Sequence, residues 1–297
     1  SPASATSSSA PRTISSFVTP DMGISVAQLL HCRLICHNSF NDVAPTIART
    51  ATLKRSDADT DTLDMATLTF HGAAQEVTGS CHMLESPATG CILMDCGLHQ
   101  GGDAVERVRD ERFPFNPADI DSVILSHAHL DHCGLLPKLF HEGFTGPIIC
   151  TRATAELLEI MLRDSVGLYL RDLEHANVRA ARRGRPTEEP AFGMDDVEGV
   201  LQLCKGYAYG EQTPLGSGAT LCFHDAGHIL GSAIIEIEFT EKGKNKRLVF
   251  SGDLGKKDSV LMNEPALLSQ ADVVLMESTY GDRVHRDEQD TVAQLND

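Results

Sequence analysis

The chain contains 297 residues, of which 41% are hydrophobic, and it carries a formal net charge of −17. That length is enough to bury a core in one large domain or two, and no apolar run approaches the ~20 residues needed to cross a bilayer. The acidic charge argues against a general nucleic-acid binder, because such proteins are usually basic. It does not exclude a polyanionic substrate, since bound divalent ions would make a pocket locally positive.

The nine cysteines form no recognisable disulfide or metal framework. Several of them, among them Cys91, Cys150 and Cys222, lie in apolar runs. This pattern is typical of reduced, buried thiols in a cytosolic protein. We therefore expect a cytoplasmic location.

Residues 1–64 differ in composition from the rest of the chain. They open with a stretch rich in Ser, Ala, Pro and Thr and sustain no periodic apolar face. We interpret them as a disordered or non-native extension. An organellar transit peptide is the alternative, because this stretch has few acids and several arginines. The globular part is expected to begin at Met65.

From Met65 onward, short apolar runs separated by polar turns predict an α/β domain. We expect strands near residues 66–71, 80–85, 91–95, 121–126, 147–150, 219–224, 232–239, 248–250 and 273–276. We expect helices starting at Gly134, at 154–170 and at 195–203, and a basic helical segment at 171–185. The arginines of that segment are interpreted as a solvated helix face, with an RNA-facing strip as the alternative.

The most informative segment follows the predicted strand that ends at Leu125. It reads Ser126-His127-Ala128-His129-Leu130-Asp131-His132 and packs three imidazoles and a carboxylate into six residues. Imidazole nitrogen and carboxylate oxygen are ligands that zinc prefers. So many ligands in one tight loop indicate two adjacent ions, whereas a solvated His-rich turn is the simpler alternative.

Three other apolar strands also end in an acidic residue close to a glycine. Asp95, Asp253 and Glu277 follow such strands, and His228 lies between glycines just before another. Buried strands of α/β sheets deliver site residues at their carboxyl ends. We therefore expect these side chains to share one pocket with the His-rich loop.

The segment His127–His132 matches the HxHxDH signature of the metallo-β-lactamase fold, and Asp95, His228 and Asp253 occur in the order of that superfamily's other motifs. Within it, Gly72–Ser80, Gly134–Pro137 and Glu277–Gly281 resemble the β-CASP ribonucleases. This branch includes the endonuclease subunit of eukaryotic pre-mRNA 3′-end processing. The resemblance implies an α/β fold, the αββα sandwich, and a zinc-dependent hydrolase that cleaves RNA.

The resemblance also implies a role for each matching residue. His127, His129 and His228 would hold one zinc ion, Asp131 and His132 a second, and Asp253 would bridge the two. Asp95, Asp131, Asp253 and Glu277 would be the catalytic carboxylates, with Asp95 orienting a ligand and Glu277 at the edge of the site. Two such ions can share a hydroxide and clamp the oxygens of a phosphoryl displacement.

The family pattern predicts three parts: residues 1–64, a metallo-β-lactamase-like domain at 65–281, and the start of a β-CASP domain at 282–297. The expected β-CASP domain, closing strands and a further zinc-binding His have no counterpart before Asp297, so we expect an incomplete chain of low nuclease activity. RNA is the expected substrate, no membrane association is expected, and a homodimer is allowed. A thioesterase or lactonase of the same fold, and a non-catalytic β-CASP scaffold subunit, are the alternatives.

Overall fold

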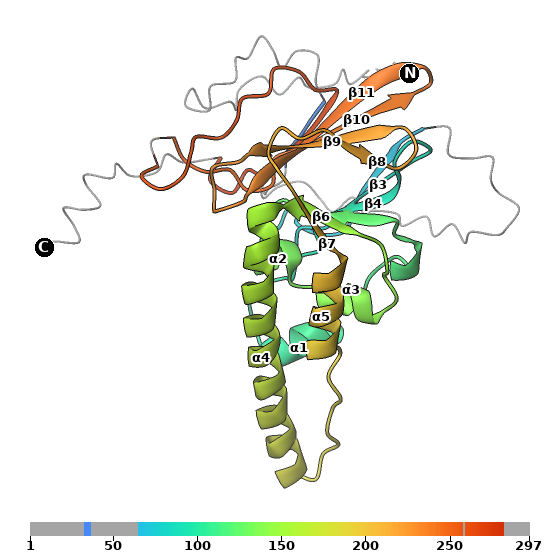
Figure 1. Cartoon of the computed structure of the whole chain (residues 1–297). Helices are drawn as coiled ribbons and strands as arrows, with labels where there is room; N and C mark the ends of the chain where they lie inside the picture. The colour runs from blue at the N-terminus through green and yellow to red at the C-terminus, as the bar shows by residue number, and fades with distance from the viewer. Residues whose placement is uncertain (1–32, 37–64, 258, 282–297) are drawn as a thin grey trace, which may run out of the picture. The chain divides into compact units, whose positions relative to one another are not determined.

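The computed structural model describes the backbone of residues 33–36 and, with side chains, residues 65–257 and 259–281. His31–Thr279 form one compact unit, built on two six-stranded sheets (Figure 1). Tyr280 and Gly281 belong to a second unit, which otherwise lies outside the described residues. The predicted division at 282–297 also falls outside them.

The first sheet carries the His-rich loop. Its strands, in spatial order, are β2 (Thr67–Phe70), β3 (His82–Ser86), β4 (Gly90–Met94), β5 (Ser122–Ile124), β6 (Ile148–Thr151) and β7 (Cys204–Tyr207). The pairs from β2 to β4 are antiparallel, and those from β4 to β7 are parallel. The parallel strands β4 and β5 therefore end side by side, and they release Asp95 and the His-rich loop at the same edge.

The second sheet faces the first. Its strands, in spatial order, are β1 (Arg33–Cys36), β12 (Val273–Met276), β11 (Lys244–Phe250), β10 (Ala233–Glu241), β9 (Ala219–Asp225) and β8 (Thr213–Leu215). β1 and β11 both run parallel to β12, and the remaining pairs are antiparallel. β1 lies within the range 1–64 that was expected outside the fold, whereas the rest of that range is outside the described residues.

Alternation along the strands divides the apolar core into two layers. On β4, Ile92 and Met94 pack with Phe223, Ile235 and other residues of the second sheet, whereas Leu93 packs with the helices. Successive strand residues point to opposite faces, so one strand serves both layers. The predicted α/β fold of two packed sheets is confirmed, and the helices of the described residues cover the outer face of the first sheet (Figure 1).

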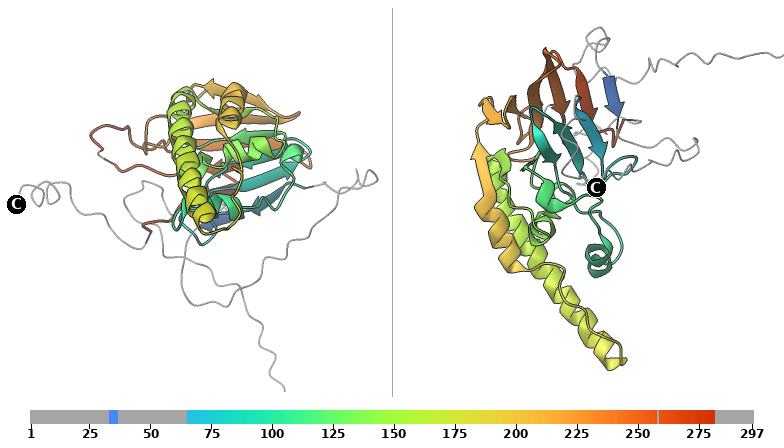
Figure 2. Two further views of the ribbon diagram at one scale, coloured as in Figure 1. Left: turned by 90° about the horizontal axis from the view of Figure 1, so that it is seen from below. Right: turned by 90° about the vertical axis from the view of Figure 1, so that its right-hand side faces the viewer.

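The helical layer is dominated by one long helix. The helices are α1 (Ala104–Asp110), α2 (Leu130–Cys133), α3 (Leu136–His141), α4 (Arg152–Arg182) and α5 (Met194–Leu203), with a 3-10 turn η3 at Pro117–Asp119. The segments predicted at 154–170 and 171–185 are continuous in α4, because the buried stripe that starts at Leu158 runs on to Leu173. Leu173 is the last buried residue of α4. The far end of α4 projects from the body (Figure 2). Among the described helices, none is long and apolar enough to cross a membrane.

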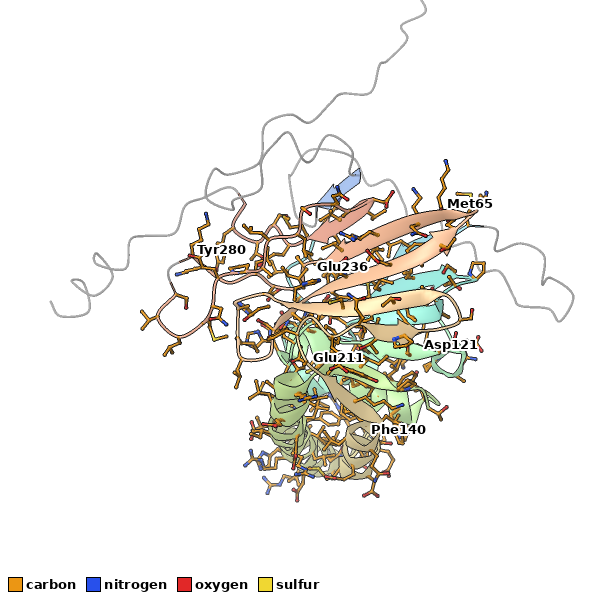
Figure 3. The ribbon with its side chains drawn as sticks, turned by 45° about the horizontal axis from the view of Figure 1, so that its top comes forward. Met65, Asp121, Phe140, Glu211, Glu236 and Tyr280 are labelled. Atoms are coloured by element: carbon orange, nitrogen blue, oxygen red, sulfur yellow. The ribbon has the colours of Figure 1, made fainter. Side chains whose placement is uncertain are left out.

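The outer face of the second sheet carries polar residues at its centre. Glu236 on β10 contacts His224 Nε2 at 2.6 Å and Arg247 Nε at 3.0 Å (Figure 3). Beside this cluster, Ala226, Ile234 and Val249 pack against Leu268 and its neighbours. A segment without regular secondary structure, rather than a helix, therefore covers this part of the sheet.

Candidate metal centre

The predicted ligands meet where the two sheets release their loops. Ala233 N donates to Ser126 O at 2.8 Å and joins the His-rich loop to the start of β10. Gly252 has a φ of +52°, and a Cβ there would lie 2.6 Å from the Cβ of Ser126. Only glycine accommodates both the backbone angle and this close approach. The turn before Asp253 is thus held directly against the His-rich loop.

Three imidazole nitrogens converge on one point. His129 Nδ1 lies 3.0 Å from His127 Nε2 and 3.2 Å from His228 Nε2. A tetrahedral zinc ion with bonds of ~2.0–2.1 Å separates its ligand atoms by roughly 3.3–3.4 Å. The three nitrogens therefore lie close to the spacing that a single zinc ion requires.

Asp253 completes this group and also reaches a second one. Its Oδ2 lies 3.7 Å from His127 Nε2 and 3.6 Å from His228 Nε2, while its Oδ1 lies 3.3 Å from His132 Nε2. Oδ2 thus faces His127 and His228, whereas Oδ1 faces His132. This is the arrangement that a bridging carboxylate between two cations requires.

The second set is smaller. His132 Nε2 lies 3.8 Å from Asp131 Oδ2, so His132, Asp131 and Asp253 supply three donors among the described residues. The first set, His127, His129, His228 and Asp253, places all its ligand atoms within 4.8 Å of one another. The residues therefore fit one four-ligand ion and a second ion with fewer protein ligands.

Asp95 lies behind the ligands, wholly buried, and fixes His132. Its carboxylate accepts hydrogen bonds from Ser126 N at 2.8 Å, Ser126 Oγ at 2.9 Å and Ser80 Oγ at 3.0 Å. His132 Nδ1 lies 2.7 Å from Asp95 Oδ2. A proton on Nδ1 leaves His132 Nε2 free for a metal, which is the usual effect of a carboxylate behind a metal-binding His.

Ser126 links Asp95 to a second candidate ligand, His127. Its hydroxyl donates to Asp95 and lies 3.0 Å from His127 Nδ1, so its oxygen can accept a hydrogen bond from the Nδ1–H of His127. The Nε2 lone pair of His127 then points toward His129 and Asp253. Sequence reasoning missed Ser126 and Ser80, because a serine beside a motif carries no local signal of a contact across strands.

The pKa values of the clustered histidines are shifted in different directions. Burial lowers the pKa of His127 well below its usual value, and it also lowers the pKa of His129. Burial acts in the same direction on His132, but the carboxylates of Asp95 and Asp253 outweigh it and raise the pKa of His132 to about 10. At neutral pH, His127 and His129 are therefore ready to bind a cation, whereas His132 must first lose a proton.

The loop that carries His228 is pinned to the start of α4. Ser232 Oγ accepts from His228 N at 3.0 Å, and the carbonyl of Gly231 accepts from Thr151 Oγ1 at 2.7 Å and Thr154 Oγ1 at 2.9 Å. Both threonines are buried. Their hydroxyls satisfy the carbonyl of Gly231, which would otherwise need water as a donor, and they hold the loop in place.

Glu277 lies behind the turn that carries Asp253. Its Oε1 accepts from Leu254 N at 2.7 Å, and its own backbone N donates to Ser251 Oγ at 3.1 Å. These contacts hold the segment on both sides of Asp253. The structure thus brings the other seven candidates together around the ligand atoms, and it places Glu277 in support of the turn; its catalytic role stays a prediction.

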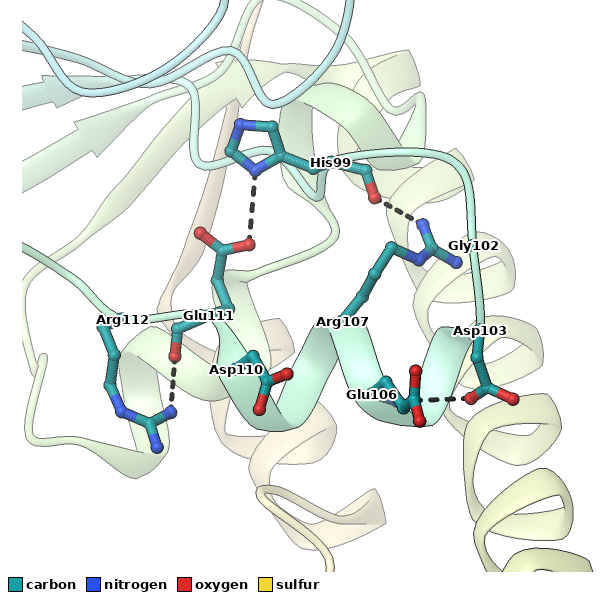
Figure 4. Close-up of a pocket in the computed structure, with 8 residues that line it drawn as sticks. All are labelled: His99, Gly102, Asp103, Glu106, Arg107, Asp110, Glu111 and Arg112. Carbon is teal, nitrogen blue, oxygen red and sulfur yellow. Dashed lines mark hydrogen bonds and ion pairs between the residues drawn. The ribbon is translucent and has the colours of Figure 1, made fainter.

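A cavity of about 370 Å³ opens onto the ligands. It is lined by Gln100, His129, Leu130, Asp131, Met161, His228 and Asp253. A larger hollow of about 620 Å³ lies around α1, where His99 contacts Glu111 at 3.2 Å and Arg107 donates to the carbonyl of His99 (Figure 4). The second hollow contains none of the predicted ligands, so the smaller cavity is the approach to the site.

Comparison with known proteins agrees with this geometry. Residues 74–207 match the Metallo-beta-lactamase superfamily. These residues therefore form a metallo-beta-lactamase domain.

Three curated relatives indicate which branch of the superfamily the chain resembles. The chain is 42% identical to Ribonuclease TTHA0252 of Thermus thermophilus over 75% of this chain and 46% of the relative. It is 33% identical to Transcription termination factor FttA of Methanocaldococcus jannaschii (72% and 31%), and 31% identical to the RNase J-like protein of that organism (73% and 43%). These relatives are consistent with the predicted β-CASP ribonuclease branch. The chain spans less than half the length of each of them.

Proposed function

We propose that this chain forms the metal-binding part of a zinc-dependent ribonuclease that hydrolyses RNA phosphodiester bonds. The observation that carries the proposal is the placement of Asp253, with one oxygen toward His127 and His228 and the other toward His132. The ribonuclease-named relatives support RNA as the substrate class. Zinc is favoured because the donors are imidazole and carboxylate.

The residues divide the task of holding two ions. His127, His129 and His228 would hold the first, Asp131 and His132 the second, with Asp253 shared. When bound, a pair of divalent ions supplies a nucleophile at neutral pH and neutralises charge on phosphoryl oxygens. Asp95 and Ser126 contact Nδ1 of His132 and of His127, so Nε2 is the nitrogen that each ring turns toward the ions.

The cavity determines how a substrate approaches. Leu130 and Met161 form apolar parts of its wall, while Gln100 contributes a polar side chain beside the ligands. A phosphodiester placed there lies directly against the open side of the site. Correct placement of the scissile group is itself a large part of catalysis, because it removes the entropic cost of bringing reactants together.

Endonucleolytic cleavage and a cytoplasmic location belong to the same proposal. The described cysteines are all free thiols, as expected in a reducing compartment. Endonuclease mode rests on the resemblance to the β-CASP branch, and a homodimer stays a prediction.

The experiment is a substrate panel with the zinc-loaded chain. Fluorescent single-stranded RNA, a thioester and a lactone are assayed with the wild-type chain and with Asp131→Ala. The proposal predicts zinc-dependent cleavage of RNA alone, lost in the variant. Faster hydrolysis of the thioester or lactone would instead establish another hydrolase of the fold, whereas zinc binding without hydrolysis of any substrate would favour a scaffold.

A further inference from the structure

The far end of α4 gathers unpaired positive charge. Residues 178–187, called here the arginine tip, contain Arg179, Arg182, Arg183 and Arg185 and no acidic residue. All four arginines are exposed. The tip is formed by the last residues of α4 and the beginning of the segment that returns to α5 (Figure 1).

The arginine tip is a folded projection, because the returning segment is fastened to the helix. Asn177 forms two hydrogen bonds of 2.8 Å with the backbone of Glu188. Nearer the body, Ala191 N donates to Tyr169 Oη at 2.9 Å, and the rings of Tyr169 and Phe192 stack with centroids 5.2 Å apart. The four arginines are therefore presented together at a fixed place.

These arginines differ from several others on the surface. Arg109, Arg163 and Arg247 each form an ion pair with a carboxylate, for example Arg163 with Glu198 at 2.9 Å. In the part of the chain that the structure describes, no ion pair involves an arginine of the tip. The arginine tip is thus locally positive, although the whole chain has a net charge of −17. Free guanidinium groups match the geometry of phosphate oxygens.

Helix α4 connects the tip to the metal centre. Met161 on α4 lines the cavity that opens onto the ligands. With a rise of 1.5 Å per residue, Arg182 lies about 31 Å further along the helix axis than Met161. The tip projects away from both sheets (Figure 2). A ligand that contacts both places must therefore be extended.

We propose that the arginine tip is a second RNA-binding surface, which contacts backbone phosphates of an RNA whose scissile bond lies at the metal centre. This inference rests on the proposed function. RNA is favoured over an acidic protein partner because the tip contains no aromatic residue, and its exposed large apolar side chain is Val178 alone. Protein interfaces normally use aromatic or apolar anchors, whereas phosphate contacts need only cations.

The test measures RNA affinity of the whole chain, stripped of metal with a chelator, as a function of salt. The probe is a fluorescein-labelled 30-nucleotide oligouridylate, read by anisotropy. The variants are R179Q/R182Q/R183Q/R185Q and the pair R183Q/R185Q, in which Gln keeps the helix propensity of Arg. Loss of four phosphate contacts should lower the slope of log affinity against log salt by up to about 2.8, since each contact on a single strand contributes about 0.7.

A matched control separates the tip from net charge. K242Q/K244Q removes two exposed cations, one from the turn between β10 and β11 and one from the first position of β11, and neither side chain is part of the metal centre. It should leave the slope unchanged, while R183Q/R185Q lowers it by about 1.4. Equal losses in the two double variants, or no loss in the quadruple variant, would overturn the proposal. So would polyglutamate competing as well as RNA.

A parallel assay keeps this inference distinct from the proposed function. Zinc-dependent cleavage of a five-nucleotide RNA, too short to span ~31 Å, is compared in the wild-type chain and the quadruple variant. Equal cleavage together with weaker binding of the 30-mer supports both proposals. Cleavage with tip-independent binding refutes the tip alone, and tip-dependent binding without any zinc-dependent cleavage refutes the proposed function alone.

Discussion

Asp95 Oδ2 lies 2.7 Å from His132 Nδ1, and this contact decides which nitrogen of His132 faces the metal centre. Asp95 adopts a φ of +60°, a left-handed conformation that only a few residue types, Asp among them, tolerate. Its backbone places the carboxylate against Ser126, Ser80 and His132 at once. Asp95, which lies outside both proposed ligand sets, thus sets the orientation of His132, a proposed ligand.

Asp95→Asn should weaken the second ion more than the first. Asn tolerates the left-handed backbone but removes the negative charge behind His132, and changes of this kind typically cost about 10–100-fold in metal affinity. Zinc titration with a competing chelator measures both sites. Asp121→Asn is the control, because Asp121 accepts a backbone hydrogen bond from Cys91 at 2.7 Å away from the ligands. An equal loss at both sites in Asp95→Asn would contradict the role assigned to it.

Asp253→Ala should lower the affinity for both ions and abolish hydrolysis, because one carboxylate serves both sets of ligands. Asp253→Asn should preserve the fold but weaken both sites, since a neutral amide is a poor bridge between two cations. Metal content after dialysis and RNA cleavage provide the measurements. Asp272→Ala is the control, because Asp272 pairs with Lys246 at 2.9 Å on the surface. Near-normal activity in Asp253→Ala would remove Asp253 from the site.

Zinc binding should release about one proton from His132 at the second site and none from His127 or His129 at the first. The pKa of His132 is raised to about 10, whereas those of His127 and His129 are lowered, so of these three His132 alone is charged at pH 7.5. The proton must leave before Nε2 can bind, so affinity at the second site should rise with pH up to about 10. Calorimetry in two buffers of different ionisation enthalpy counts the protons. Release with the first ion instead would contradict this assignment.

Gly231→Ala should displace the His228 loop and weaken the first ion. Gly231 has a φ of +82°, and a Cβ there would lie 2.5 Å from Thr154 N. Gly243→Ala is the matched control, since Gly243 has a φ of +73° with open space around it. The control should cost about 1–2 kcal/mol of stability from the backbone alone and leave zinc binding intact. Thermal unfolding and zinc titration compare the two, and equal zinc affinities would show that the loop does not depend on this contact.

The candidate ligands could be identified from the sequence, whereas the residues that position them could not. The proposed ligands lie in short motifs at strand ends, and such motifs are visible within a few residues of sequence. The contacts of Ser126 with Asp95, and of Gly231 with Thr151 and Thr154, join residues 31, 80 and 77 positions apart. No local pattern encodes such pairs, so they emerged only from the folded arrangement.

The fold shows the same distinction. Strands with buried apolar runs, such as β4 and β10, were predicted within a few residues. β7 and β8 were missed, because Cys204–Tyr207 has a half-exposed pattern and Thr213–Leu215 contains a proline. The single helix α4 was divided in two, because its apolar stripe ends at Leu173 while its backbone remains helical to Arg182. Local hydrophobicity predicts buried faces, but it does not show where a solvated helix ends.

The most direct test of the shared metal centre is anomalous diffraction at the zinc edge from crystals of the zinc-loaded chain. We predict a strong peak bounded by His127, His129 and His228, and a weaker one beside Asp131 and His132, with Asp253 between them. Metal analysis should agree, with one zinc retained per chain on dialysis and a second bound more weakly. A zinc peak remote from Asp253, or two equally tight ions, one of them held by a residue outside this set, would contradict the account.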